Sequence, residues 1–493
     1  MAINDLTTSA RQDYPDHNDA TINDMPEKQL QADDIAATVL HGAIETIDLD
    51  SPASRRFLDK SCVSYAALWG MQKDAHLQGA DYSWLTTIFY VGYLASEFPT
   101  NVIFQKFDIA RTCGIFVILW GMVLLCMAAA NNFPGLLTVR LFLGILEAGV
   151  SPCFVLMTAM FYRRNEQPLR TAIWFSMNGM ANVFGGLIGY GIGFIKASLP
   201  AWKFPFIIFG SVTVAWGIVF TLLAPPNPTK ARWLTEEEKT IAVMRVVDNE
   251  TGLDNKKLKW YQVKEALVDV NFWLFNLLTL ANCIPNGGVT AFAPLIVNGF
   301  GYNKFQSTLL NMPSGGAQVL ALWISGYLAT RFAGIRHFLM IGGILVALIG
   351  AVLIYALSNE HKVARLIGYY LLVGFSATFV LNLTLVQSNV AGRTKRTMFA
   401  SSVFISYCVG NLIGPQLFFE REAPRYQSGF ASMIVCFSVQ TLIIAVMYLV
   451  NLRENRRRDR TAVEGQAASN EVRIAMELSD LTDRENLHFR YLL

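Results

Sequence analysis

The amino-acid sequence predicts an all-α protein that crosses a lipid bilayer many times. Of its 493 residues, 53% are hydrophobic and only 16% are charged, which is too apolar a composition for a soluble globular protein. The apolar residues form continuous runs of about 20 or more, the length that a helix needs to cross the hydrocarbon core. These runs lack the alternation of barrel strands, so they predict membrane helices and not an outer-membrane β-barrel.

Eleven apolar segments are long enough to span the bilayer. They are residues 82–105, 111–131, 135–161, 170–195, 203–224, 271–297, 306–330, 337–357, 364–390, 397–419 and 428–451. A twelfth stretch, "RRFLDKSCVSYAALWGM" (Arg55–Met71), is apolar but short. As a helix, residues 57–71 reach about 22 Å, less than the hydrocarbon thickness of about 30 Å.

The charges of the connecting loops predict the orientation. "QKFDIAR", "YRRNEQPLR", "RFAGIRH" and "GRTKR" are rich in Lys and Arg, whereas the alternate loops "NNFPG" and "NGFGYNKF" carry few positive charges. The positive-inside rule then places both termini and the long central loop in the cytoplasm. This parity requires an even number of crossings, so either the short segment crosses the membrane or the acidic N-terminal tail lies outside.

The polar central stretch divides the predicted spans into two groups of six. Its Thr235, followed by three glutamates, is typical of the start of a short helix. We expect a disordered cytosolic tail at 1–54, a transmembrane half at 55–224, a cytosolic central loop with a short helix at 225–270, a second transmembrane half at 271–452 and a cytosolic tail at 453–493.

Two pairs of opposite charges lie inside apolar segments. Arg140 and Glu147 are seven residues apart, which is about two helical turns, so both project from one helix face. A charge at the bilayer centre costs at least about 2.5–3.5 kcal/mol and usually lines a polar cavity. We interpret Arg140 as the partner of an anion and Glu147 as a proton-exchanging carboxylate; a structural pair that locks helices together is the alternative.

The second pair, Asp59 and Lys60, lies in the short stretch, with side chains about 100° apart around the helix. One could face a cavity while the other contacts a neighbouring helix. The alternative is an interfacial pair at the end of a short helix, because Arg55 and Arg56 precede it.

Polar residues also recur in the second half of the chain. In the segment 271–297, the proline and glycines of "IPNGG" (Ile284–Gly288) predict a break in the helix that turns Asn286 toward a ligand. Asn382 and Tyr407 are further candidates in two later spans. For amide side chains in membrane helices, packing between helices is the alternative.

The sequence contains no nucleotide-binding glycine loop, metal-ligand cluster or nucleophile constellation. We therefore expect no enzyme activity, no metal and no cofactor. The net charge of +3 follows the loops and gives no indication of nucleic-acid binding.

Several motifs together resemble fungal anion:cation symporters of the major facilitator superfamily, especially the allantoate permease group. The resemblance covers about residues 57–455. It rests on "RLFLGILEAGVSP" (Arg140–Pro152), "IPNGGVTAFAPLIVNGFGY" (Ile284–Tyr302), "LLNMP" (Leu309–Pro313), "NVAGRTKR" (Asn389–Arg396) and "YCVGNLIGPQLFFEREAPRYQSGF" (Tyr407–Phe430). The terminal "LTDRENLHFRYLL" also looks like the ending common in the group.

The resemblance implies two six-helix halves around a central cavity, and secondary active transport of a small organic anion by alternating access. The implied substrates are allantoate or ureidosuccinate, a vitamin acid or a small peptide. Substrate binding then maps to Lys60 and Arg140, and proton coupling to Asp59 and Glu147. For this group we expect proton-driven uptake by a monomer in the plasma membrane.

The chain departs from the family pattern in two places. The gating loop, within "NVIFQKFDIARTCG", keeps the basic Lys106 and Arg111 but not the usual glycine. In the first helix, about a dozen apolar residues before Asp59 are replaced by "DLDSPASRR". Three explanations remain open: the gene model has lost an exon, the carrier is impaired, or residues 35–47 pack in and cover the gap.

Two other functions remain as alternatives. A non-transporting nutrient sensor would fit the shortened first helix and the long acidic tail. An exporter of a secondary metabolite would use the same fold, because the motifs do not encode the direction of transport.

Overall fold

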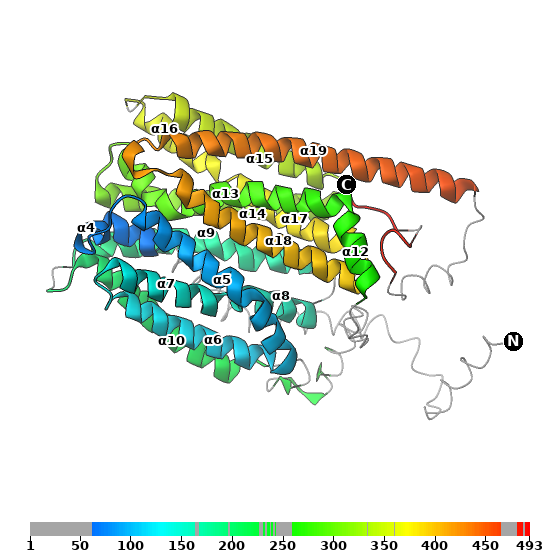
Figure 1. The fold of residues 1–493 in the computed structure, drawn as a ribbon, viewed down its shortest axis with the longest axis horizontal. Coiled ribbons are helices and arrows are strands. Elements are labelled where there is room, and N and C mark those ends of the chain that lie inside the picture. Colours follow the sequence, from blue (N-terminus) through cyan, green and yellow to red (C-terminus); the bar gives the residue numbers. More distant parts are fainter. Residues whose placement is uncertain are drawn as a thin grey trace.

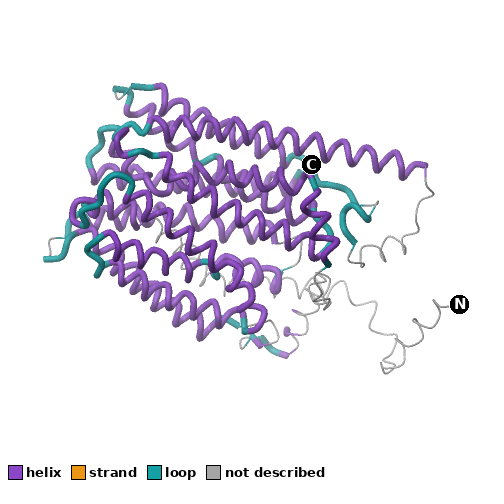
Figure 2. The backbone as a smooth tube through the Cα atoms, in the orientation of Figure 1, coloured by secondary structure: helices purple, strands orange, loops and turns teal. Residues whose placement is uncertain are grey.

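The computed structural model describes residues 62–162, 167–195, 198–225, 259–332, 334–358, 360–464, 481–486 and 489–493, with a few residues between 230 and 242. Within this part the chain is a bundle of long, roughly parallel and antiparallel helices (Figures 1 and 2). The first group of helices fills the lower part of the view and the second group the upper part. This is the two-halved helical architecture that the sequence predicts.

The first half begins with a short helical stretch at residues 62–68. It continues with α4 (Met71–Asp74), α5 (Asp81–Lys106), α6 (Ile109–Met127), α7 (Phe133–Glu147), α8 (Val150–Phe161), α9 (Gln167–Ile192), η2 (Ala201–Lys203) and α10 (Phe204–Leu223). The second half contains α12 (Trp260–Val268), α13 (Val270–Gly299), α14 (Lys304–Arg331), α15 (Arg336–Ala356), α16 (Lys362–Leu372), α17 (Phe375–Asn389), α18 (Arg393–Ile413), η4 (Gly414–Leu417), η5 (Glu420–Glu422) and α19 (Gln427–Glu464).

Helices cover all eleven of the predicted long spans. Within the described residues, eight helical stretches are long and apolar enough to cross a membrane. The more polar α5, α9 and α14 are also long, at 26, 26 and 28 residues. Because α9 packs along α14 and α5 along α18, these helices face the other half of the protein as well as lipid.

The predicted break at Ile284–Gly288 is wrong: α13 is one continuous helix through Pro285. Proline cannot donate a hydrogen bond to the carbonyl four residues earlier. Here the buried amide of Gln440 on α19 takes over, because its Nε2 donates to the Ala281 carbonyl at 3.0 Å. Gly288 lets the helix pack closely, since a Cβ there would lie 2.4 Å from the Phe418 ring.

The first helix is described only from Cys62 onward, so the predicted pair Asp59 and Lys60 lies outside the described residues. The described stretch is well packed: Tyr65 is buried and its hydroxyl accepts a hydrogen bond from Asn311 Nδ2 at 2.9 Å. In the central loop, the Thr235 hydroxyl accepts a hydrogen bond from the Glu238 amide at 3.3 Å, as expected for a helix cap.

The bundle has two chemically different ends. One end, which we call the vestibule end, carries α4, η4 and η5. The other, which we call the tail end, carries α12 and residues 481–486 and 489–493, which we call the C-terminal segment (Figure 1). The C-terminal segment packs against the bundle: Leu492 and Asn389 exchange two hydrogen bonds of 2.7 and 3.0 Å. The loop charges predict that the tail end is cytoplasmic.

Candidate functional site

Arg140 and Glu147 are both buried on α7, with 3% and 0% of their surfaces exposed. Their helix lies directly against α5, because glycines at the crossing remove the side chains that would keep the backbones apart. A Cβ on Gly144 would lie 2.0 Å from the Phe89 carbonyl oxygen, and one on Gly92 would lie 2.3 Å from that of Leu141. This close contact fixes how α7 is turned relative to α5, and therefore the direction in which Arg140 and Glu147 point.

Arg140 lines a small cavity between the halves of the protein. The first helix, α5 and α7 form the wall from the first half, and α13 forms the wall from the second half. The residues that line the cavity are Val63, Ser64, Tyr82, Thr86, Phe89, Tyr90, Arg140, Gly287, Thr290 and Ala291. The cavity volume is about 20 Å³, which is room for about one water molecule. In this conformation the halves are closed around the guanidinium.

Tyr90 connects this cavity to Glu147 and to the predicted Tyr407. It lines the cavity and is close enough to both residues to interact with them electrostatically. Its ring centroid lies 6.3 Å from that of Tyr407. Tyr90 therefore links the Arg140 cavity, which it lines, to the neighbouring Glu147 and Tyr407, neither of which lines that cavity.

Each of the two predicted asparagines is hydrogen-bonded to a residue on a neighbouring helix of the second half. Asn286 donates to Asn411 Oδ1 at 2.8 Å, and the buried Asn382 donates to Thr279 Oγ1 at 2.9 Å. This geometry is that of the packing alternative, in which amide side chains join neighbouring helices.

The two gating-loop residues lie at the tail end. Lys106 is exposed and is the last residue of α5. The side chain of Arg111 is 62% exposed, and its Nη1 lies 3.8 Å from Asp108 Oδ2. They lie at the opposite end of the bundle from α4.

Sequence reasoning missed several residues that line the Arg140 cavity. Tyr82, Thr86 and Tyr90 recur every four residues along α5, a hydroxyl-bearing face that could have been recognised in an otherwise apolar span.

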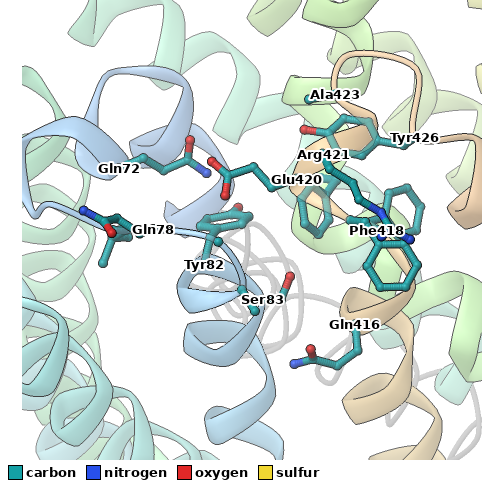
Figure 3. A pocket seen from close by; sticks show the side chains of 15 residues that line it. Gln72, Gln78, Tyr82, Ser83, Gln416, Phe418, Glu420, Arg421, Ala423 and Tyr426 are labelled. Carbon is teal, nitrogen blue, oxygen red and sulfur yellow. The ribbon is translucent and has the colours of Figure 1, made fainter.

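A larger pocket of about 650 Å³ opens at the vestibule end. Figure 3 shows its residues facing one another across the two halves, with Gln72, Gln78 and Ser83 on one side and Glu420 and Arg421 on the other. Its size is in the usual range for small-molecule sites. We call this pocket the vestibule.

A layer of aromatic rings closes the bottom of the vestibule. Phe292 stacks on Phe418 at 5.0 Å between ring centroids, and meets the Tyr82 ring edge-on at 5.2 Å. The Tyr82 hydroxyl donates to the Ala291 carbonyl at 2.6 Å, which ties α5 to α13. Tyr82 lines both the vestibule and the Arg140 cavity, so this layer separates the two spaces.

Substituting Tyr82 with phenylalanine should loosen the aromatic layer, because it removes the hydrogen bond to Ala291. A neutral hydrogen bond contributes about 0.5–1.5 kcal/mol. We expect a cysteine placed at Thr290 to react about two- to tenfold faster with a membrane-impermeant thiol reagent in Tyr82→Phe. Tyr355→Phe, on the outside of α15, is the control; equal rates in both variants would contradict a closing role.

Comparisons with known proteins agree with this architecture. The Major Facilitator Superfamily profile matches residues 56–415. An uncharacterized transporter of Schizosaccharomyces pombe is 40% identical over 442 residues, 88% of this chain and 83% of the relative. The allantoate permease of Saccharomyces cerevisiae is 35% identical over 451 residues, 89% and 82% respectively. A thiamine pathway transporter of that yeast is 34% identical over 439 residues, 88% and 82%.

A solved structure supports the fold independently. A bacterial homolog of the human lysosomal transporter Spinster, in an inward-facing and unoccupied conformation, matches with a TM-score of 0.59 and 17% identity. The match covers 81% of this chain and 94% of that chain. The chain therefore belongs to the Major Facilitator Superfamily and is a multi-pass membrane transporter with a fungal allantoate permease among its relatives.

Proposed function

We propose that this transporter takes up a small organic anion together with protons by alternating access. The observation that carries the proposal is the position of Arg140, a buried cation that lines a cavity formed by both halves. A guanidinium held at membrane depth is a strong partner for a carboxylate, which it can contact through two parallel hydrogen bonds. Allantoate, ureidosuccinate, a vitamin acid or a small peptide would supply that carboxylate.

The two spaces in the structure suggest a route for the substrate. The vestibule of about 650 Å³ is large enough for such an anion, whereas the Arg140 cavity of about 20 Å³ is not. Substrate would therefore enter the vestibule first and reach Arg140 only when Tyr82 and Phe292 move apart. Movement of one half against the other then exposes the site to the tail end.

Glu147 is suited to coupling this cycle to protons. Burial favours the protonated form of a carboxylate, while a nearby cation favours the charged form. When a substrate anion binds Arg140, it screens that cation, so Glu147 takes up a proton more readily. Anion and proton are then loaded together.

The coupling is tested by Glu147→Gln in proteoliposomes with allantoate as the first probe. We expect accumulation driven by a pH gradient to fall at least about tenfold (about 1.4 kcal/mol in the coupling free energy), while exchange of labelled for unlabelled substrate continues. Glu97→Gln, which neutralises a carboxylate on α5, should retain gradient-driven accumulation. Normal accumulation by Glu147→Gln would rule out the coupling role.

The binding role is tested by Arg140→Gln. Removing one partner of a buried charge pair costs about 3–5 kcal/mol, so we expect the affinity for the anion to fall by at least about 100-fold. Arg365→Gln is the matched control, because Arg365 is equally buried but packs over the Phe300 ring at 4.4 Å. Arg365→Gln should lower the stability and leave the affinity of the folded protein for the anion unchanged. Loss of affinity in Arg365→Gln but not in Arg140→Gln would refute the assignment.

For the cellular setting we propose a monomer in the plasma membrane with both termini in the cytoplasm. The basic loops support this orientation through the positive-inside rule. An epitope tag after Leu493 should be reached by antibody only in permeabilised cells.

A further inference from the structure

A third pocket lies at the tail end, far from the Arg140 cavity and the vestibule. Its volume is about 500 Å³, and it lies between the start of α13, the end of α19 and the C-terminal segment. Four arginines and two carboxylates line it, which leaves two net positive charges; the lining residues are Asp269, Val270, Asn271, Val450, Arg453, Glu454, Arg457, Arg458, Arg484 and Tyr491.

The base of this pocket is held in place by contacts within the protein. Arg458 is buried and donates to Glu454 Oε1 at 2.9 Å and to the Phe489 carbonyl at 2.8 Å. Tyr491 is buried beside it and donates to Asp483 Oδ2 at 2.6 Å. The C-terminal segment therefore forms one wall of the pocket.

The mouth of the pocket, in contrast, is open and basic. The side chains of Arg457 and Arg484 are 72% and 44% exposed, and Arg453 is also exposed. Arg453 and Arg457 are one helical turn apart on α19, so they lie on the same face. Guanidinium groups from α19 and from the C-terminal segment thus converge on one opening.

The pocket lies at the depth of lipid head groups. From Gln427 at the start of α19 to Arg453 is about 39 Å at 1.5 Å per residue, close to the full thickness of a bilayer with its head groups. Trp273, about one turn after Val270 on α13, is 54% exposed, as is typical of aromatic side chains at a membrane interface. Val270 lines the pocket and is itself 55% exposed, so the rim is partly apolar.

We propose that this pocket binds the phosphate-bearing head group of an anionic membrane lipid. Arginine binds phosphate oxygens through its forked donors, and basic pockets at the cytoplasmic ends of membrane helices suit such head groups. Val270 at the rim, and the exposed Trp273 about one turn further along α13, would contact the acyl chains. Because Arg484 and Tyr491 come from the C-terminal segment, a bound lipid also stabilises the docked position of that segment.

The experiment uses the full-length protein in nanodiscs of phosphatidylcholine, titrated with fluorescent phosphatidylinositol 4-phosphate. We expect Arg453→Gln with Arg457→Gln to weaken binding at least about tenfold. The matched control is Arg456→Gln with Arg460→Gln, which removes the same charge from exposed positions on α19 outside the pocket. An equal loss in both double variants would mean attraction by general charge and would overturn the proposal.

Further arms address the source of the phosphate and the folding of the variants. Soluble inositol phosphate and inorganic phosphate should compete only at concentrations at least about 100-fold above those of the lipid. Competition at equal concentrations would overturn the lipid assignment in favour of a soluble ligand. Arg453→Lys with Arg457→Lys keeps the charges but loses the forked donors, so it should bind the lipid more weakly than the wild type and more tightly than the double glutamine variant. Binding no tighter than that of the double glutamine variant, with a normal elution profile, would also count against the proposal.

Discussion

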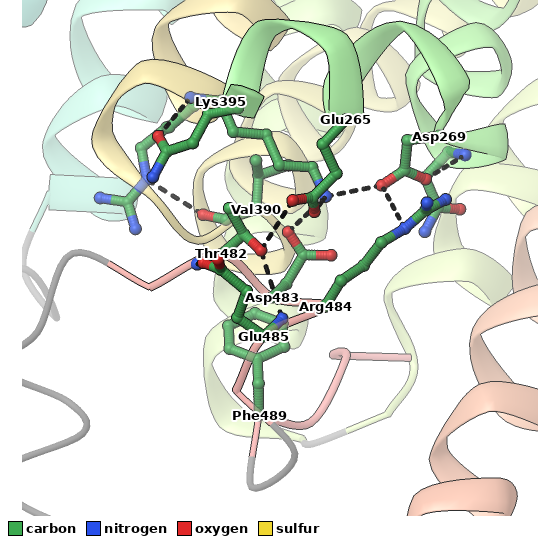
Figure 4. Close-up of polar contacts among 12 residues, drawn as sticks. Glu265, Asp269, Val390, Lys395, Thr482, Asp483, Arg484, Glu485 and Phe489 are labelled. Atoms are coloured by element: carbon green, nitrogen blue, oxygen red, sulfur yellow. Dashed lines mark hydrogen bonds and ion pairs between the residues drawn. The ribbon is translucent and has the colours of Figure 1, made fainter. Parts of the chain in front are cut away.

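Replacing Lys395 with methionine will destabilise the tail end and release the C-terminal segment. The Lys395 ammonium is fully buried and lies 2.9 Å from Glu265, 2.7 Å from Asp269 and 2.7 Å from Asp483 (Figure 4). Without it, three neighbouring carboxylates repel one another. Breaking a buried ion pair by removing one partner costs about 3–5 kcal/mol, since the remaining charge is left uncompensated.

The measurements are the melting temperature in detergent and the rate of trypsin cleavage after Arg484. We expect a lower melting temperature and faster cleavage in Lys395→Met. Lys264→Met, on the exposed face of α12, removes the same charge and should change neither. A second variant, Asp483→Asn in the Lys395→Met background, should recover part of the stability by removing one of the repelling charges; no recovery would contradict the electrostatic explanation.

Introducing valine at Gly144 will force α5 and α7 apart and abolish transport. The atoms nearest to the added Cβ belong to the backbone, with the Phe89 carbonyl oxygen at 2.0 Å and the Tyr93 nitrogen at 3.0 Å. A backbone cannot rotate away as a side chain can, so the helices must separate. Overpacking typically costs about 1–3 kcal/mol. Arg140 and Glu147 lie about one turn to either side and would move with the helix.

Uptake in cells and melting temperature should both fall in Gly144→Val. Gly342→Ala on α15 is the control, because a Cβ there meets no atom within 4 Å. That change should be neutral or stabilising by up to about 1 kcal/mol, as alanine is the better helix former. Normal uptake by Gly144→Val would show that the close helix crossing does not hold the site.

The ion-pair cluster around Lys395 gives a structural role to two sequence motifs that had been singled out only because they resemble those of a known family. Lys395 lies in "NVAGRTKR", and Asp483 lies in the terminal "LTDRENLHFRYLL". Their contact joins residues that are far apart in the chain. Nothing in either motif alone predicts a partner, because a lysine in a basic loop is equally compatible with full exposure to water.

The prediction for α13 failed for a related reason. Proline and glycine in "IPNGG" have strong local preferences against a helix, and these preferences predict a break. The break does not form, since Gln440 on a different helix satisfies the carbonyl freed by Pro285. Tertiary packing thus overrides local propensity, and Asn286 turns toward Asn411.

The sequence by itself determined the membrane-spanning helices, the two halves and the burial of Arg140 and Glu147. These features follow from hydrophobic length and from the cost of exposing a charge to lipid, both of which are properties of a local stretch of chain. Only the tertiary structure decided that Tyr82 separates the vestibule from Arg140, and that the C-terminal segment joins Lys395 and completes an arginine pocket. Those features depend on distances between residues from separate helices, which no single segment encodes.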